Sequence, residues 1–279
     1  MNLYTIDSGH FKLDGGAMHG VVPKSLWQKF NPADEQNLCS WAMRCLLIET
    51  GNRLILIDTG IGDKQDTRFF GHYHLHGDTS IDSELKKHGF HRSDVTDVFL
   101  THLHFDHVGG AISRIGENLV PAFENATYWS NQAHWDWAVH PNDREKASFL
   151  KENILPIQES GQLKMITCAE GEEWLPGIRV RYVNGHTEAM MLPLLSYKGR
   201  NILYCADLLP SLAHLPLPWI MGYDMRPLDT LAEKKTTLKE AVDNDWLLYF
   251  EHDAHHEMCR LQQTDKGIRH EEILLLSDL

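Results

Sequence analysis

Short runs of apolar residues recur along this chain and alternate with glycine-rich and polar segments. Residues 41–50 and 53–58 are two such runs, and they flank Gly51-Asn52. A two-residue Gly-Asn link between runs of this kind predicts a β-hairpin. A second hairpin and four single strands are expected at the remaining apolar runs, which are 192–197 with 201–205, 95–100, 127–129, 178–183 and 246–250.

Helical spacing is clearest near the end of the chain. Leu228, Leu231, Leu238 and Val242 recur at helical intervals and predict a helix over residues 228–242. Start and stop signals predict three shorter helices, which are 81–88 before Gly89, one capped by Ser130 that runs through Trp137, and 143–152 with an Asn142/Glu145 capping box. The first 37 residues predict an edge strand followed by a loop or a short helical turn.

Several of the predicted strands end on a histidine or a carboxylate. The residues concerned are Asp58, His102, His104, His186, Asp207 and His252. Functional side chains gather where strand ends and loops meet at one edge of a sheet. No composition break, repeat or Pro/Ser-rich linker interrupts the sequence, so residues 1–279 are predicted to form one α/β domain.

Composition and charge narrow the choice of partners and location. The 279 residues are 42% hydrophobic and 23% charged, which is ordinary for a globular protein. A net charge of −13 disfavours nucleic acid, because phosphate binding needs cationic groups. Five dispersed cysteines without a CxxC pair predict reduced thiols in the cytoplasm. We find no signal peptide and no membrane-spanning run, expect no membrane partner, and leave a homodimer open.

The densest chemistry lies in residues 101–110, Thr-His-Leu-His-Phe-Asp-His-Val-Gly-Gly. His102 and His104 are two apart, so their rings point the same way in an extended chain. Asp106 and His107 then need a sharp change of direction, which a strand entering a helix would supply. Imidazole and carboxylate without thiolate suit Zn, Fe, Mn or Co at a hydrolytic centre. The alternative is a set of solvated or core-packed histidines.

Asp58 ends one of the buried strands. A carboxylate in such a place costs free energy unless it is hydrogen-bonded. We expect Asp58 to orient the metal ligands through hydrogen bonds, without binding the metal itself. The alternative is a cap on backbone N–H groups at the strand end.

Together these residues resemble the metallo-β-lactamase superfamily. The matching motifs are HxHxDH at 102–107, LIDTG at 56–60 and GHT at 185–187, followed by Asp207 and His252. The resemblance covers nearly the whole chain and implies a four-layer αββα sandwich with a dinuclear metal site. It implies one ion bound by His102, His104 and His186, a second bound by Asp106, His107 and His252, and Asp207 as the bridge.

Other segments resemble the group that contains N-acyl-homoserine lactonases and relatives of methyl parathion hydrolase. These segments are DGGAMHGVVP near the start, ADLLP at 206–210, Gly222-Tyr223-Asp224 after Trp219, and FEHD at 250–253. The lactonases of this group carry a tyrosine three residues after the bridging aspartate, where this chain has Pro210. Tyr223 is the candidate substitute for that tyrosine as proton donor and oxyanion ligand.

The resemblance implies a hydrolase in which a hydroxide shared by two divalent ions attacks a lactone or related ester, with Asp106 and Asp207 also in catalytic roles. Zinc is the first choice of metal, with iron, manganese or cobalt as alternatives. Organophosphate or aryl ester hydrolysis, a glyoxalase II-like thioesterase and a non-catalytic binding protein are the alternative functions. We expect a small neutral or partly apolar substrate and a pocket formed by Trp27, Phe30, Phe69, Phe70, Met190, Leu209, Trp219 and Met221.

Overall fold

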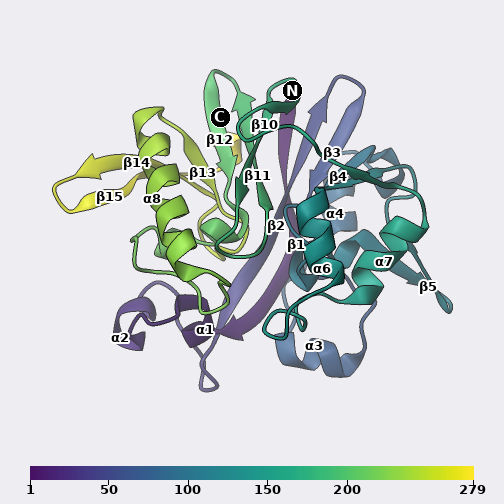
Figure 1. The fold of residues 1–279 in the computed structure, drawn as a ribbon, viewed down its shortest axis with the longest axis horizontal. Helices are drawn as coiled ribbons and strands as arrows, with labels where there is room; N and C mark the ends of the chain where they lie inside the picture. Colours follow the sequence, from purple (N-terminus) through teal and green to yellow (C-terminus); the bar gives the residue numbers. More distant parts are fainter. The chain divides into compact units, whose positions relative to one another are not determined.

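The computed structural model describes residues 1–279, and the chain divides into two compact units. Unit 1 holds residues 1–9 and 43–167, and unit 2 holds residues 10–42 and 168–279. Each unit carries a large β-sheet with its own helices (Figure 1). None of the helices has both the length and the apolar character that crossing a bilayer requires. The single domain that we expected from the sequence stays a prediction.

The main sheet of unit 1 has six strands in the order β1-β2-β3-β4-β7-β8. The strands are β1 Asn2–Asp14, β2 Leu38–Thr50, β3 Arg53–Ile57, β4 Asp97–Phe99, β7 Thr127–Ser130 and β8 Leu163–Met165. β1 and β2 continue into residues that belong to unit 2. From β3 to β8 the strands pair in parallel, as expected for strands connected through helices. A separate hairpin consists of β5 Ile112–Ile115 and β6 Asn118–Pro121.

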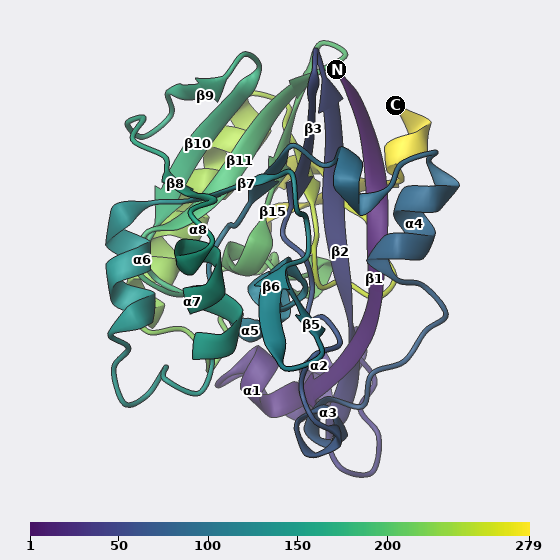
Figure 2. The ribbon, with the colours of Figure 1, turned by 90° about the vertical axis from the view of Figure 1, so that its right-hand side faces the viewer.

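The helices of unit 1, except α3, bury apolar side chains. They are α3 Thr67–Tyr73, α4 Ile81–Lys87, α5 Phe105–Val108, α6 Gln132–Val139 and α7 Lys151–Glu159, with 3-10 turns at Arg92–Asp94 and Gly109–Ala111. Leu85, Trp135 and Ile154 from the helices share one buried cluster with Leu56 and Tyr128 from the sheet. Figure 2 shows α6 beside α7, with the β5–β6 hairpin next to α7.

The sheet of unit 2 has seven strands in the order β15-β14-β13-β12-β11-β10-β9. All neighbours are antiparallel except β12 and β13. The strands are β9 Glu173–Leu175, β10 Ile178–Val183, β11 Met190–Tyr197, β12 Arg200–Tyr204, β13 Leu247–Tyr249, β14 Met258–Thr264 and β15 Gly267–Leu274.

Unit 2 has one long helix, α8, which lies along one face of its sheet (Figure 1). Thr237, Leu238 and Ala241 form part of the buried side of α8. The shorter elements are α1 Gly15–His19, α2 Lys24–Trp27, 3-10 turns at Ala206–Leu208, Leu212–His214 and Leu276–Asp278, and the long helix itself is α8 Pro227–Asp243.

Most of the predicted elements are confirmed. Thr50 pairs with Arg53 across the Gly51-Asn52 turn, and Tyr197 pairs with Arg200 in the second hairpin. The four single strands and the helices at 81–88 and 228–242 are present within a few residues of their predicted ends. The prediction for the first 37 residues is also confirmed, since β1 lies at the edge of its sheet and short helices follow.

Two helix starts were predicted wrongly. Asn131, and not Ser130, caps α6, because its side chain accepts a hydrogen bond from the backbone N–H of His134. The helix predicted at 143–152 is absent over residues 143–150, and α7 starts only at Lys151. Asn142 does accept from the backbone N–H groups of Arg144 and Glu145, but the chain continues only as turns until α7 starts. Residues 143–148 contain a single apolar side chain, so they lack the apolar face that stabilises a short helix.

The glycines of the motif at 101–110 allow a close backbone approach. A Cβ on Gly109 would lie 2.1 Å from the carbonyl oxygen of Ile61, and one on Gly110 would lie 2.1 Å from that of Thr59. The backbone N–H of Thr59 also donates to the carbonyl of His107 at 2.7 Å. The segment after β3 is therefore packed directly against the histidine motif.

We expect Gly109→Ala to lower the free energy of unfolding by about 1–3 kcal/mol, because the new methyl group overlaps a backbone carbonyl. Gly71→Ala is the matched control, since Gly71 lies in α3 with open space around it. That control should raise stability by about 0.5–1 kcal/mol, because alanine is the better helix former. Urea unfolding of both variants measures the difference, and equal effects would contradict this account.

Candidate metal centre

The histidine motif of unit 1 lies at the predicted transition from extended chain to helix. His104 is extended, with φ −65° and ψ 153°, and is the N-cap residue of α5. Asp106 and His107 follow in the first turn of α5. All four predicted ligands, His102, His104, Asp106 and His107, are at most 7% exposed. The ring centroids of His102 and His104 are 4.6 Å apart, and those of His102 and His107 are 3.9 Å apart.

Asp58 connects β3 to this motif. Its Oδ1 accepts a hydrogen bond from the backbone N–H of Thr101 at 2.8 Å, and its Oδ2 accepts from Thr101 Oγ1 at 2.6 Å and from His107 Nδ1 at 3.1 Å. Both interpretations of Asp58 therefore describe contacts that exist. Thr101 Oγ1 also lies 3.0 Å from His102 Nδ1 and accepts from it. With Nδ1 bonded in both rings, Nε2 is the atom suited to coordinate a metal ion.

Glu145 orients the His104 ring, and it does so through Nε2 instead of Nδ1. His104 Nε2 donates to Glu145 Oε1 at 2.9 Å, so His104 would coordinate through Nδ1. Glu145 is 3% exposed, and its second oxygen accepts from Trp137 Nε1 at 2.7 Å. The sequence analysis missed this role, because nothing in the spacing connects residues 41 positions apart. It also missed His134, whose Nε2 accepts from the backbone N–H of Leu103 at 2.8 Å.

Unit 2 brings its three predicted ligands together, with two histidines on one carboxylate. The two oxygens of Asp207 lie 3.1 Å from His186 Nε2 and 3.1 Å from His252 Nε2. On the far side of each ring, His186 Nδ1 donates to Asp224 Oδ1 at 2.9 Å, and His252 Nδ1 donates to the carbonyl of Ala42 at 2.8 Å. Both rings therefore present Nε2 on the side of Asp207.

Two non-glycine residues in or beside these groups of predicted ligands have a left-handed backbone conformation. Asp58 has φ 56°, and Ala206, which precedes Asp207, has φ 40°. Such a conformation costs about 1–2 kcal/mol for a residue with a Cβ. It recurs at functional sites, where the surrounding structure compensates for the strain. Here it turns each aspartate sharply away from the end of its strand.

Charge around His186 favours a cation. Burial alone would disfavour the charged ring, but the carboxylates of Asp207 and Asp224 raise the pKa of His186 to about 10. A metal ion at Nε2 would replace the proton there, so metal uptake would release protons. The candidate metal ligands in both units are carboxylates and imidazoles, and the second nitrogen of each imidazole is hydrogen-bonded to the protein. This donor set fits divalent cations such as Zn²⁺.

The predicted substrate residues form separate aromatic groups within each unit. In unit 1, Phe69 contacts Phe70, and its ring centroid lies 5.6 Å from that of Phe105, the neighbour of Asp106. In unit 2, Phe30 is 52% exposed and meets Trp219 edge-on at 5.5 Å. The remaining residues range from buried Trp27, Met190, Leu209 and Met221 to Tyr223, which is 40% exposed. Their role in binding stays a prediction, as does the catalytic role of Tyr223.

A stacked pair of buried histidines beside Trp219 was not foreseen. The rings of His19 and His214 are 4.7 Å apart and almost parallel, and His19 also stacks on Trp27 at 5.2 Å. His214 Nε2 donates to the carbonyl of Met18, and its Nδ1 accepts from Ser211. Burial lowers the pKa of His19 to about 4, so this pair is neutral at neutral pH. It connects α1 to the turn that follows Asp207.

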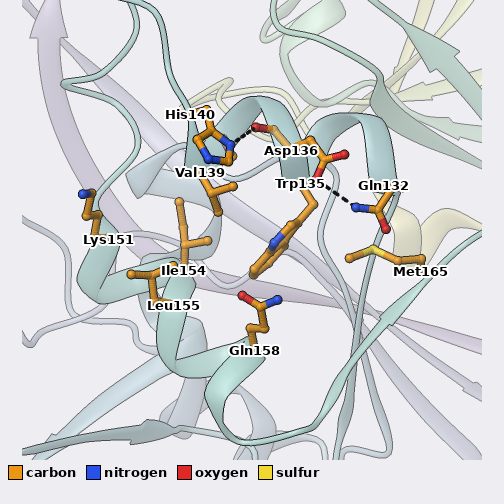
Figure 3. A pocket seen from close by; sticks show the side chains of 11 residues that line it. Gln132, Trp135, Asp136, Val139, His140, Lys151, Ile154, Leu155, Gln158 and Met165 are labelled. Atoms are coloured by element: carbon orange, nitrogen blue, oxygen red, sulfur yellow. Dashed lines mark hydrogen bonds between the residues drawn. The ribbon is translucent and has the colours of Figure 1, made fainter.

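Unit 1 also contains a cavity of about 480 Å³ between α6 and α7 (Figure 3). Its apolar floor includes Trp135 and Ile154, and exposed polar side chains such as Gln158 surround it. None of the predicted ligand or substrate residues lines it. This cavity is therefore distinct from the group of predicted ligands in unit 1.

Comparison with known proteins gives a consistent result. The sequence profile of the Metallo-beta-lactamase superfamily matches residues 44–252. An N-acyl homoserine lactonase of Bacillus thuringiensis subsp. kurstaki is 29% identical over 196 residues, which is 66% of each sequence and so just under two thirds of that relative.

Solved structures extend the similarity to nearly the whole chain. A probable metal-dependent hydrolase from Staphylococcus aureus has a TM-score of 0.88 at 27% identity and covers 98% of this chain and 96% of its own. A dizinc quorum-quenching lactonase in complex with a product has a TM-score of 0.79 at 21% identity, covers 98% and 95%, and bears on the fold alone. The predicted α/β fold class, the metallo-β-lactamase fold, is confirmed.

We expect Glu145→Gln to weaken metal binding by about 10–100-fold, because His104 loses a charged acceptor at Nε2. Glu159→Gln, an exposed change at the end of α7, is the control and should leave affinity unchanged. Competition with a chromophoric zinc chelator measures both. Wild-type affinity in Glu145→Gln would show that this carboxylate does not support a ligand.

Proposed function

This chain belongs to the metallo-beta-lactamase superfamily, and from that premise we propose that it is a dinuclear metal-dependent hydrolase of acyl-homoserine lactones or related esters. The observation that carries the proposal is the set of buried histidines and carboxylates in the two units. Each of these histidines is oriented by a hydrogen bond to a protein acceptor. One ion would be bound by His102, His104 and His186, the other by Asp106, His107 and His252, with Asp207 bridging them.

When bound, two divalent ions would supply activated water at neutral pH and polarise the substrate carbonyl. The protein's own groups orient the site around them. Asp58, Glu145 and Asp224 fix the histidine rings, so no reorganisation is needed during the reaction. The Asp207 carboxylate lies between two rings and fixes the spacing of the ligands. Asp106 would accept a proton at its carboxylate, and the exposed Tyr223 hydroxyl would donate one to the departing oxygen.

Three observations support a neutral acyl lactone as the substrate. The curated relative is named an N-acyl homoserine lactonase, and a similar structure is a dizinc lactonase. The candidate substrate residues are apolar or aromatic, which suits an acyl chain. The net charge of −13 disfavours polyanions. We therefore propose zinc as the metal and quorum quenching as the role, in the reducing cytoplasm to which the five dispersed cysteines are suited.

Hydrolysis of organophosphates or aryl esters is the second candidate. The observation that favours it is Pro210, which stands where the lactonases of the resembling group carry a tyrosine. Pro210 is buried, and its carbonyl accepts a hydrogen bond from the backbone N–H of His252. A phosphotriester or aryl ester has a better leaving group and depends less on a proton donor.

A rate panel over acyl-homoserine lactones, a paraoxon-type triester, an aryl ester and a glutathione thioester tests the choice. We expect the highest kcat/KM on a lactone. A higher value on the triester or aryl ester would select the second candidate. A preference for the thioester, or no turnover of any compound by the zinc-loaded protein, would refute both.

Asp207→Asn should lower kcat by at least about 100-fold while the fold is retained, because the amide keeps the volume but loses the charge that bridges two cations. Asp265→Asn, an exposed change between β14 and β15, is the control and should keep full activity. Circular dichroism checks the fold of both variants. Unchanged turnover in Asp207→Asn would contradict a bridging carboxylate.

A further inference from the structure

Helix α8 carries a lysine that is buried inside unit 2. Lys234 is 1% exposed, and its Nζ donates to the carbonyl of Pro216 at 2.9 Å and to that of Trp219 at 2.7 Å. Burial lowers the pKa of Lys234 to about 7, although the Asp224 carboxylate acts in the opposite direction. Burying an amine costs free energy that an apolar residue would not. The position therefore calls for an explanation other than core packing.

The two carbonyls lie at the start of residues 216–226, the segment that leads into α8. This segment contains no helix or strand. It carries Trp219, Met221 and Tyr223, which are candidates for contact with the substrate. A chain without secondary structure leaves its carbonyls to be satisfied by other groups, and Lys234 satisfies two of them from one atom.

Backbone hydrogen bonds hold the rest of the 216–226 segment. The N–H of Gly222 donates to Ala17 in α1 at 2.7 Å, and the N–H of Met225 donates to the carbonyl of His186 at 3.1 Å. A Cβ on Gly20 would lie only 2.4 Å from the carbonyl oxygen of Ile220. The segment is thus packed between α1 and the residues around His186 with little room to shift.

The end of the segment determines how the His186 ring is oriented. Asp224 is 2% exposed, and its Oδ1 accepts from His186 Nδ1 at 2.9 Å. The residue before Lys234 fixes the backbone that leads to His186, because the Glu233 carboxylate accepts from the backbone N–H groups of Asn184 at 2.7 Å and Gly185 at 3.0 Å. Glu233 therefore anchors the backbone that leads to His186, and its neighbour Lys234 anchors the segment that carries Asp224, the acceptor of the His186 ring.

Close packing makes this arrangement sensitive to small shifts. A Cβ on Gly185 would lie 2.3 Å from the backbone nitrogen of Thr230 in the first turns of α8. Movement of α8 relative to the 216–226 segment would therefore change the position of His186 or of Asp224. A buried donor that bonds two carbonyls of the segment opposes such movement.

We propose that Lys234 is a positioning residue, which fixes the 216–226 segment and, through Asp224, the orientation of His186. The inference rests on the proposed function in one respect, since it takes His186 as a metal ligand and Trp219 and Met221 as substrate contacts. The alternative is a lysine that only stabilises the fold.

Hydrogen exchange of the metal-free protein, followed by mass spectrometry, separates these two cases. Lys234→Met keeps an unbranched side chain that is one atom shorter and removes its donors, and Lys235→Met is the matched control on the exposed side of α8. In Lys234→Met we expect peptides from residues 216–226 to exchange at least tenfold faster, with α8 and the strands of unit 2 unchanged. The control should match wild type. Unchanged exchange in 216–226, or an equal rise throughout unit 2, would overturn the proposal.

Kinetics of the zinc-loaded variants give a second readout. A loosened substrate segment should raise KM at least fivefold in Lys234→Met, and a misoriented His186 should weaken zinc affinity at least tenfold. Wild-type KM and zinc affinity would contradict a positioning role. If the wild-type protein hydrolyses no lactone or ester, the proposed function fails, while the exchange experiment still decides whether Lys234 fixes the segment.

Discussion

Each histidine of the candidate centre donates a hydrogen bond from one ring nitrogen to a protein oxygen. An imidazole that is bonded at one nitrogen has a fixed tautomer and a fixed plane, so the other nitrogen presents its lone pair in one direction. The acceptors are carboxylates, a hydroxyl and a carbonyl, and all but the hydroxyl, which belongs to the residue before His102, come from distant parts of the chain. They are Thr101 for His102, Glu145 for His104, Asp58 for His107, Asp224 for His186 and Ala42 for His252. The rest of the structure brings these acceptors to the rings.

This constraint accounts for several features with no chemistry of their own. Gly109 and Gly110 are needed because the chain after β3 must approach the motif closely enough for Asp58 to reach His107. Glu233 and Lys234 are needed because the segments that carry His186 and its acceptor have no secondary structure to hold them. Unit 2 therefore uses its buried charged side chains in two ways. Some contact a histidine ring directly, and others bond the backbone that supports the histidine.

The sequence allowed prediction of the two hairpins and of the strand ends at which the candidate ligands lie, because short-range periodicity and motif spacing determine these features. It did not allow prediction of most of the acceptors. Glu145 looked like a helix cap, and the long separation between it and His104 leaves no local pattern. Asp224 was noticed only as part of a resemblance, and nothing in the helical spacing of residues 228–242 singled out Lys234. Contacts of this kind depend on tertiary packing, which periodicity does not describe.

The central claim is that the bonded ring nitrogen of each histidine determines which atom binds metal in a two-metal centre. Anomalous diffraction at the zinc edge from crystals of the zinc-loaded protein tests it directly. The account predicts two peaks about 3.5–4 Å apart, with His104 coordinating through Nδ1 and the other four histidines through Nε2. A single peak, or coordination of His104 through Nε2, would contradict it.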